Sequence, residues 1–251
     1  MRILMLNPNT TVAVTERLVT VGARVMSPGS EIVPLTATRG VPYIATRAEA
    51  QIGGAIALEM LAEHHHTVDA AIIAAFGDPG LLGARELFDI PVVGMAEAAM
   101  LTACMLGRRF AIVTFATALG PWYQDCVDMH GMSARCAGIR MLDGAFRAIS
   151  DVQDEKEALL VDLALRTLDE TDADTLIFGG APLAGLADKV RSQIPVPVVD
   201  QVQAAVKLAE ALVALRPRKA IRGTFSRPAP KPTAGLPSAL ANHIEHKAGR
   251  T

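Results

Sequence analysis

Two stretches of the sequence share a pattern that could build one binding site. DAAIIAAFGDPG, residues 69–80, and DTLIFGGAPLAG, residues 174–185, each pass from an apolar run into a loop of small residues. The pattern predicts buried strands that carry their loops to a pocket. Ala75 and Gly180 correspond in the two stretches, yet neither side chain can transfer a proton. The reactive groups of such a site would therefore come from other residues.

Two further loops carry polar side chains that suit a ligand. In NPNTT, residues 7–11, Asn9 or Thr10 can cap a following helix while free backbone N–H groups attract a carboxylate or a polarised carbonyl. FATALGPW, residues 115–122, is its counterpart, with Thr117 as the candidate cap and Thr114 just before it. A plain helix cap explains NPNTT equally well. For the two threonines, an ordinary cap and an ordinary strand hydroxyl are the alternatives.

Asp78 and Tyr43 are weaker candidates for acid–base chemistry. Asp78 lies in FGDPG, residues 76–80, and could act as an acid or base, although Asp before Pro-Gly more often forms a turn. The Tyr43 hydroxyl could reach the cleft, although a tyrosine in a surface loop is the commoner case. GGAPLAG, residues 179–185, matches neither a P-loop nor a dinucleotide fingerprint.

Histidines and cysteines form no recognisable metal motif. Residues 64–66 are three consecutive histidines, whose side chains would point in different directions on a helix and therefore cannot share one ion. Cys104, Cys126 and Cys136 lack metal-ligand spacing and fall in helical or strand patterns, which favours packing over nucleophilic roles. We expect no metal site.

Short apolar runs alternate with longer amphipathic segments, which is typical of parallel strands joined by crossover helices. The predicted strands are 2–8, 30–37, 68–76, 91–95, 109–116, 139–143, 174–180 and 196–200. Predicted helices lie near 11–26, 47–66, 80–88, 96–106, 120–131, 153–170, 183–193 and 201–215. The expected fold class is α/β.

The two halves of the chain repeat one another. RILMLNPNT matches RFAIVTFAT, VDAAIIAAF matches ADTLIFGGA, and PVVGMAEAAM matches PVVDQVQAAV, in one order and with nearly constant spacing. The alternative is that buried parallel strands resemble one another in any case. We predict two similar lobes with parallel-type sheets flanked by helices, related by a pseudo-twofold axis, with a cleft between them. We expect lobe 1 at residues 1–106, although the chain may cross back between the lobes, and lobe 2 at residues 107–216. Residues 217–251 would form a C-terminal arm with one short helix in ALANHIEHK.

The composition narrows the classes of partner. The net charge is −2 and aromatic residues make up 4 % of the chain, which argues against nucleic-acid binding. The apolar runs are shorter than a bilayer span, and no signal segment opens the chain. We therefore expect a cytoplasmic protein that binds a small molecule rather than a membrane.

The sequence resembles the aspartate/glutamate racemase superfamily, and within it the hydantoin and allantoin racemase branch. The resemblance covers nearly the whole chain through LNPNTT, FGDPGLLGARE, PVVGMAEAAM, RFAIVTFAT and PVPVVDQVQAAVKLAE. It implies two α/β lobes around the active site, no cofactor, a homo-oligomer, and two cysteines that exchange a proton from opposite faces of a carbon atom. By motif those cysteines fall at Ala75 and Gly180, so this chain lacks both.

Three functions follow from the resemblance and its departures. The first is an isomerase acting on an amino-acid-like carboxylate or a cyclic ureide, with an acid and base other than the two cysteines. The second is a decarboxylase, another lyase or a ring-opening hydrolase on the same scaffold, and the third is a non-catalytic binder of small ligands. In each case the residues expected to contact the ligand are Asn9, Thr10, Tyr43, Ala75, Phe76, Gly77, Thr114, Thr117, Gly180, Ala181 and Pro182.

Overall fold

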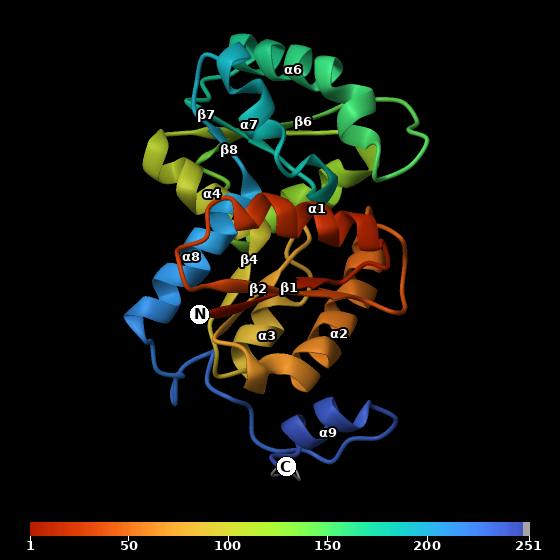
Figure 1. Ribbon diagram of the computed structural model, residues 1–251, viewed down its shortest axis with the longest axis vertical. Coiled ribbons are helices and arrows are strands. Elements are labelled where there is room, and N and C mark those ends of the chain that lie inside the picture. Colours follow the sequence, from red (N-terminus) through yellow and green to blue (C-terminus); the bar gives the residue numbers. More distant parts are fainter. Residues whose placement is uncertain (248–251) are drawn as a thin grey trace.

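The protein has two lobes, each built on a four-stranded parallel sheet (Figure 1). The computed structural model describes residues 1–247. The sheet of lobe 1 has the strand order β2-β1-β3-β4 and that of lobe 2 has the order β6-β5-β7-β8. Every strand pair is parallel. The same strand order in both lobes confirms the predicted repeat.

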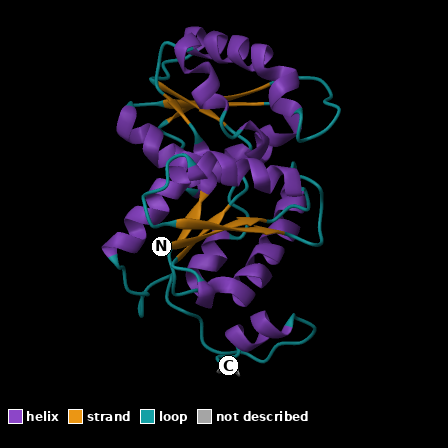
Figure 2. Cartoon of the chain, viewed as in Figure 1, coloured by secondary structure: helices purple, strands orange, loops and turns teal. Residues whose placement is uncertain are grey.

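The first half of the chain alternates strands and helices as its patterns predict. Its elements are β1 (Arg2–Asn7), α1 (Val12–Ala23), β2 (Glu31–Thr36), α2 (Arg47–His64), the 3-10 turn η1 (His65–Thr67), β3 (Ala70–Ile73), α3 (Leu81–Leu87), β4 (Val92–Gly94) and α4 (Met95–Leu106). Strands β1, β3 and β4 are buried except at Arg2, because helices cover both faces of the sheet. Figure 2 shows this layering in both lobes.

The second half repeats the arrangement and ends in an additional helix. Its elements are β5 (Phe110–Thr114), η2 (Thr117–Leu119), α5 (Gly120–Met129), β6 (Cys136–Met141), α6 (Val152–Glu170), β7 (Thr175–Phe178), η3 (Ala181–Leu183), α7 (Leu186–Val190), η4 (Arg191–Gln193), β8 (Val198–Val199), α8 (Gln201–Leu215) and α9 (Ser238–Ile244). Strand β6 begins three residues before the predicted start, and its register with β5 shifts beside Gly138, whose φ is +152°. Helix α7 is short because the loop before it extends to Gly185, which adopts a left-handed conformation.

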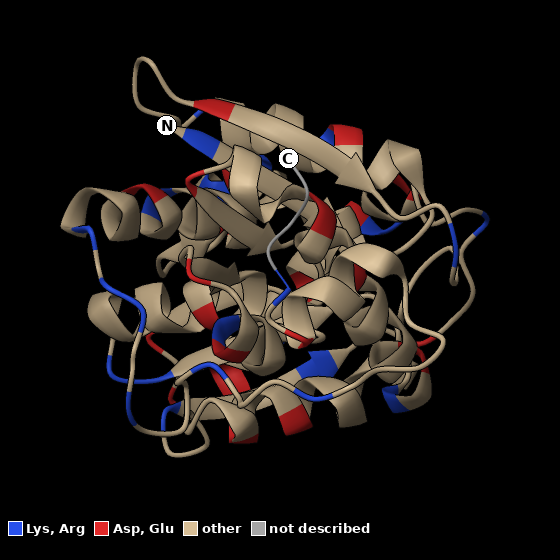
Figure 3. Cartoon of the chain, turned by 90° about the horizontal axis from the view of Figure 1, so that it is seen from below, with Lys and Arg blue, Asp and Glu red and all other residues tan. Residues whose placement is uncertain are grey.

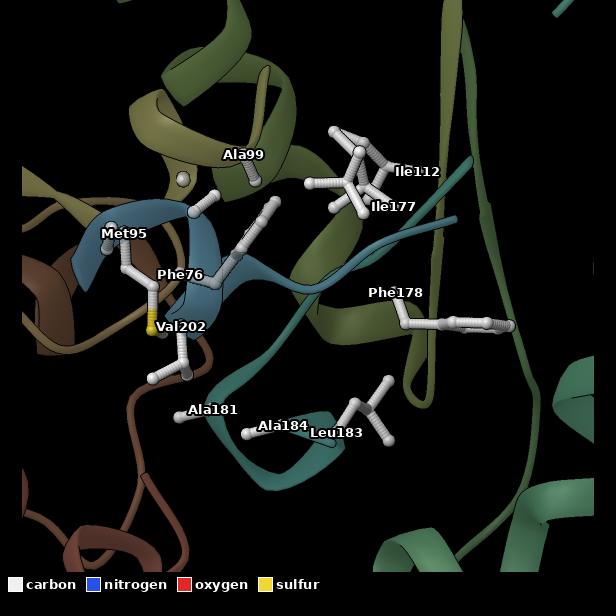
Figure 4. Close-up of a cluster of buried hydrophobic side chains, with 14 of the residues drawn as sticks. Phe76, Met95, Ala99, Ile112, Ile177, Phe178, Ala181, Leu183, Ala184 and Val202 are labelled. Carbon is white, nitrogen blue, oxygen red and sulfur yellow. The ribbon is translucent and has the colours of Figure 1, made fainter. Parts of the chain in front are cut away.

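Helices α1, α4 and α8 lie between the two sheets (Figure 1). Helix α4 follows β4 of lobe 1 but also packs against β7 and β8 of lobe 2. Helix α8 follows β8 of lobe 2 and packs against β3 and β4 of lobe 1. Figure 4 shows side chains from both lobes, among them Phe76, Ile177 and Val202, in one buried cluster. The lobes therefore share a continuous hydrophobic core, which fixes their strand-end loops relative to one another.

The C-terminal segment lies on lobe 1. Lys219 donates hydrogen bonds to the carbonyl oxygens of Arg85 and Phe88 at the end of α3. In α9, which packs against α2, the His243 ring stacks on Phe88 with 4.6 Å between ring centroids. Leu240 is buried in the same region. The predicted short helix is confirmed, and it packs against α2 on the outer side of lobe 1.

Charged residues of both signs are interspersed over the helices (Figure 3). The C-terminal segment 216–231 differs, because it carries basic residues and no acidic ones. Within residues 1–247, no helix has the combination of length and apolar character that a bilayer span requires.

Candidate active site

A small cavity lies where the strand-end loops of the two lobes meet. The loops after β1, β3, β5 and β7 all contribute to it, as expected for the carboxyl ends of parallel strands. The open space is about 30 Å³, enough for about two water molecules. Its lining residues are Asn9, Val14, Tyr43, Ile44, Ala75, Phe76, Phe115, Leu119, Trp122, Tyr123, Ile149, Gly180, Ala181 and Pro182.

Most of the predicted ligand-contacting residues line this cavity. Those it brings together are Asn9, Tyr43, Ala75, Phe76, Gly180, Ala181 and Pro182, which come from both halves of the repeat. Four predicted residues do not line it, namely Thr10, Gly77, Thr114 and Thr117. Ala75 and Gly180 thus line one cavity although 105 positions separate the two residues in the sequence.

Thr117 is not the helix cap that the sequence suggested. It begins the 3-10 turn η2, whose capping residue is Ala116, and its side chain is exposed. Leu119, and not Thr117, lines the cavity from this turn. Thr114 is fully buried and donates a hydrogen bond of 2.7 Å to the carbonyl oxygen of Gly179. In this structure Thr114 therefore supports the loop that carries Gly180.

The loop before α1 is held by hydrogen bonds of its own. Asn9 accepts a hydrogen bond of 3.0 Å from the backbone N–H of Thr11 and one of 3.1 Å from the side chain of Asn7. The N–H of Thr10 donates to the carbonyl oxygen of Val41. The capping residue of α1 is Thr11, and its side chain makes no capping hydrogen bond. The prediction that Asn9 or Thr10 caps α1 is wrong, because the Asn9 side chain closes a turn one step earlier.

Ala75 and Gly180 differ in what their backbone permits. Ala75 has a negative φ, as ordinary residues do, and its side chain faces the cavity. Gly180 has φ of +126°, and a Cβ atom there would lie 2.8 Å from Phe115 and 3.4 Å from the Tyr123 hydroxyl. Its peptide group is also fixed by Gln201, which accepts from its N–H at 3.1 Å and donates to its carbonyl oxygen. Glycine at position 180 is therefore required by this backbone conformation.

Aromatic side chains fill much of the cavity wall. The rings of Phe76 and Tyr123 lie 4.8 Å apart, and Tyr123 and Trp122 lie 5.5 Å apart. Phe146 from the loop before α6 contacts both Tyr43 and Phe115 edge-on, each with centroids 5.7 Å apart. Phe115, Trp122 and Tyr123 were not among the residues predicted from the sequence. Phe115 lies at the end of a predicted strand and Trp122 and Tyr123 lie at the start of a predicted helix, so the only signal in the sequence was their position in and beside the loop FATALGPW.

The lining side chains carry no charge. Asn9, Tyr43 and Tyr123 are the polar ones, and the others are apolar or glycine. Burial raises the pKa of the Tyr123 phenol, and the neighbouring Thr114 hydroxyl counteracts that shift only in part. The phenol is therefore neutral and able to donate a hydrogen bond across the whole physiological range.

Asp78 points away from the cavity into a buried network. Its carboxylate accepts hydrogen bonds of 2.8 Å from the backbone N–H groups of Ala96 and Glu97 at the start of α4, and one of 3.0 Å from His130. Gly77, with φ of +115°, leaves room for the Trp122 ring beside it. These contacts favour the turn interpretation of FGDPG and do not place Asp78 where it could reach a ligand in the cavity.

His130 is held in its charged form by this network. Burial would lower the pKa of His130, but its hydrogen bonds to Asp78 and Glu97 outweigh burial and raise the pKa to about 9. Burial likewise opposes the ionised form of Glu97, yet His130 and Arg85 lower its pKa to about 2. The network joins the lobes, because Asp78 follows a strand of lobe 1 and His130 follows α5 of lobe 2.

Asp78, Cys126 and His130 also have side-chain atoms within 4.8 Å of one another, the kind of group that can hold a metal ion. Two of the three already form an ion pair, and burial raises the pKa of the Cys126 thiol well above its usual value. A metal would need that thiol deprotonated and the ion pair broken. Cys104 and Cys136 lie elsewhere, so none of the three cysteines lines the cavity.

Comparisons with known proteins agree with the fold and show the family. Residues 3–209 match the family model described as Asp/Glu/Hydantoin racemase. A hydantoin racemase from Pseudomonas sp. (strain NS671) is 32 % identical over 239 residues, which cover 94 % of this chain and 95 % of the relative. Among solved structures, an allantoin racemase from Klebsiella pneumoniae is 34 % identical with a TM-score of 0.89, covering 96 % of this chain and 98 % of the other. An arylmalonate decarboxylase shares the fold at 18 % identity, with a TM-score of 0.60 over 90 % of this chain and 98 % of the other.

Proposed function

Because the chain belongs to the Asp/Glu/hydantoin racemase family, we propose that it inverts the stereocentre of a neutral cyclic ureide, of the hydantoin or allantoin type, without a cofactor. The family membership identifies it as an enzyme of the racemase family. The resemblance seen in the sequence is thereby confirmed. Which ureide it takes, its assembly into a homo-oligomer and its location in the cytoplasm belong to the proposal.

The uncharged lining of the cavity is the observation that favours a ureide. Aspartate and glutamate would each bring two carboxylates and an ammonium group into the cavity. Burying even a neutral polar group without a hydrogen-bond partner costs roughly 2–7 kcal/mol, and burying an unpaired charge costs more. A hydantoin ring is neutral and offers carbonyl oxygens and N–H groups. Asn9, Tyr43 and Tyr123 match these groups with neutral donors and acceptors.

The chemistry required is modest for such a ring. The hydrogen on the ring carbon lies next to a carbonyl group, and its removal leaves an electron pair that delocalises onto the carbonyl oxygen. The resulting enolate is planar at that carbon, so the proton can return on either face. A neutral ring carries no carboxylate charge that would oppose enolate formation. A weaker base therefore suffices than for an amino acid.

A ring-sized ligand cannot enter the cavity without movement. The open space of about 30 Å³ is far smaller than pockets that hold organic ligands, which are roughly 300 Å³ or more. Several contacts between the lobes would have to separate. The clearest are the Arg47 ion pair with Asp125 and the hydrogen bond of 2.9 Å from Arg17 to the carbonyl oxygen of Ser150. The Arg47 ion pair lies at the surface, where breaking it costs little, whereas the Arg17 hydrogen bond is partly buried.

Isotope exchange tests the proposal directly. Single enantiomers of 5-substituted hydantoins, allantoin, aspartate and glutamate would be incubated with the protein in D₂O, and the loss of the signal from the α-hydrogen would be followed by NMR against an enzyme-free sample. We expect exchange and inversion of at least one ureide above background, and none of the two amino acids. Ala75→Leu, which fills the cavity, should abolish the exchange while thermal unfolding shows that the variant is folded. Exchange of the amino acids alone, or of none of the compounds, would contradict the proposal.

A further inference from the structure

Tyr123 is the most deeply enclosed of the polar side chains that line the cavity. Its residue is 2 % exposed, whereas Tyr43 is only partly buried. The ring is held between Phe76 and Trp122, and it projects from α5, a regular helix. Its hydroxyl therefore has one fixed direction, as a preorganised hydrogen-bond donor needs.

The hydroxyl reaches the open space beside Gly180. A Cβ atom at position 180 would lie 3.4 Å from the Tyr123 hydroxyl. Because Gly180 has no side chain, the phenol of Tyr123 is the polar group at this wall of the cavity. Phe115 packs on the other side of the same position, 2.8 Å from where that Cβ would lie, and its ring offers no donor. Ala75 lines the cavity from the opposite lobe.

The protonation state limits what the phenol can do. Because burial raises its pKa, the phenol remains protonated and cannot serve as a base near neutral pH. A neutral donor in an apolar enclosure instead stabilises negative charge that develops on a nearby oxygen. The same enclosure strengthens the interaction, because little solvent competes with it.

We propose that Tyr123 is a catalytic residue that donates its hydroxyl hydrogen bond to the enolate oxygen of the bound ring, and this assignment rests on the proposed function. A hydroxide ion on the Ala75 side takes the proton of the ring C–H bond and becomes water. The electron pair of that bond moves onto the carbonyl oxygen, which Tyr123 holds without giving up its own proton. Water then returns a proton to the ring carbon on either face, and the oxygen regains its carbonyl bond.

Tyr123→Phe removes the hydroxyl and keeps the ring packing. The exchange rate constant should fall about 100-fold, as for loss of one oxyanion donor, with KM changed by less than about threefold because the bond is strong only in the enolate. Tyr43→Phe, the same change at the other tyrosine, should reduce the rate constant less. Ser226→Ala removes an exposed hydroxyl on the C-terminal segment and should change neither parameter.

A binding measurement separates this assignment from the proposed function. Barbiturate is a planar cyclic ureide that is anionic at neutral pH and imitates the enolate without turnover. Calorimetry should show that Tyr123→Phe weakens barbiturate binding about 10-fold, equivalent to about 1.4 kcal/mol, while the affinity for neutral hydantoin stays within about threefold. The chain has two tyrosines, so ¹³C labelling of the phenol carbon gives two signals, and barbiturate should shift the one that Tyr123→Phe removes.

The outcomes are distinct. Exchange by Tyr123→Phe within about twofold of the wild type, or equal loss of barbiturate and hydantoin affinity, overturns the role of Tyr123. If the wild-type protein exchanges none of the ureides, the proposed function fails. The barbiturate measurements then decide by themselves whether Tyr123 is an anion-stabilising donor, and an unshifted Tyr123 signal or an unchanged affinity rejects it.

Discussion

The loops after β3 and β7 occupy equivalent places in the two lobes but are anchored by different residues. In lobe 2 the helix that follows the next strand, α8, is capped by the residue directly before it. Asp200 accepts hydrogen bonds of 2.9 Å and 3.1 Å from the backbone N–H groups of Val202 and Gln203. Its second oxygen accepts from the N–H of Gly185 at 2.6 Å and so fastens the loop. The carboxylate belongs to the helix and reaches toward the loop.

In lobe 1 the capping carboxylate comes from the loop and reaches toward the helix. The alignment of PVVGMAEAAM with PVVDQVQAAV puts Gly94 where lobe 2 has Asp200. The two N–H groups at the start of α4 are satisfied by Asp78, which belongs to the loop. A Cβ at position 94 would overlap the carboxylate of Asp78. Both lobes thus place one carboxylate at a helix N-terminus, where free N–H groups and the helix dipole favour it, but from different positions in the chain.

The two positions at which the resemblance places cysteines, Ala75 and Gly180, differ in backbone conformation because their loops are anchored differently. Ala75 lies in a loop anchored at Asp78, three residues further on, and keeps an ordinary backbone conformation. Gly180 lies in a loop clamped at its own peptide group by Gln201 and adopts φ of +126°. The first position could accept a small side chain without change in the backbone. The second could not.

Removing the two capping carboxylates should give the largest difference between the lobes. Asp78→Ala leaves the buried charge of His130 without its main partner, and we expect a loss of about 3–5 kcal/mol in the free energy of unfolding. Asp200→Ala removes hydrogen bonds to backbone N–H groups only and should cost about 2 kcal/mol. Urea unfolding at neutral pH measures both. Equal losses would mean that the ion pair with His130 adds nothing to the cap.

Cysteine introduced at the two equivalent cavity positions should separate them next. Gly180→Cys forces a Cβ against Phe115 and keeps a left-handed conformation, so we expect a loss of about 2–4 kcal/mol in the free energy of unfolding. Ala75→Cys adds one atom toward open space and should change the value by less than about 1 kcal/mol. Thermal unfolding of both variants, read beside Gly180→Ala, gives the test. A stable Gly180→Cys protein would show that the loop can change conformation.

The smallest expected effect is a dependence of stability on pH, caused by the ion pairs of His130 with Asp78 and Glu97 between the lobes. The pKa of His130 rises from 6.5 when unfolded to about 9 when folded, so its contribution is complete below pH 6.5 and disappears as the pH rises through 9. We expect unfolding free energy to fall by about 1–3 kcal/mol across this interval. For Glu97, whose pKa falls from 4.5 to about 2, the contribution is present above pH 4.5 and is lost as the pH falls through 2.

The measurement is a series of urea unfolding curves between pH 6 and 10, with His130→Gln as the matched variant. That variant should be less stable than the wild type at pH 6 and should lose less stability as the pH rises. Parallel curves for the two proteins would show that His130 is not charged in the folded state.

Local patterns were sufficient to predict most elements of the fold. Seven of the eight predicted strands contain the observed strand within their limits, because alternating apolar runs and turn residues act over short distances. Strand β6 is the exception, where the irregular register at Gly138 moved the start toward Cys136. The repeat in the sequence predicted the shared strand order, since the same pattern of crossovers gives the same sheet.

Part of the candidate site was also within reach of the sequence. The positions of Ala75 and Gly180 followed from the matched loops, because residues after parallel strands gather at one edge of a sheet. Asp78 and Thr117 show the limit of that rule. It places a residue near the cleft, but whether its side chain faces the cavity depends on φ and on the nearest unsatisfied N–H group, which for Asp78 lies on α4.

The sequence by itself determined the α/β class, the twofold repeat and the absence of cysteine at both matched positions, because these depend on residue type and spacing alone. Only the tertiary structure decided that Phe115 and Tyr123 surround Gly180, that glycine is required there, and that the cavity is uncharged. Such facts depend on how side chains from two lobes fill one space, and packing at that scale is set by the whole core rather than by any one segment.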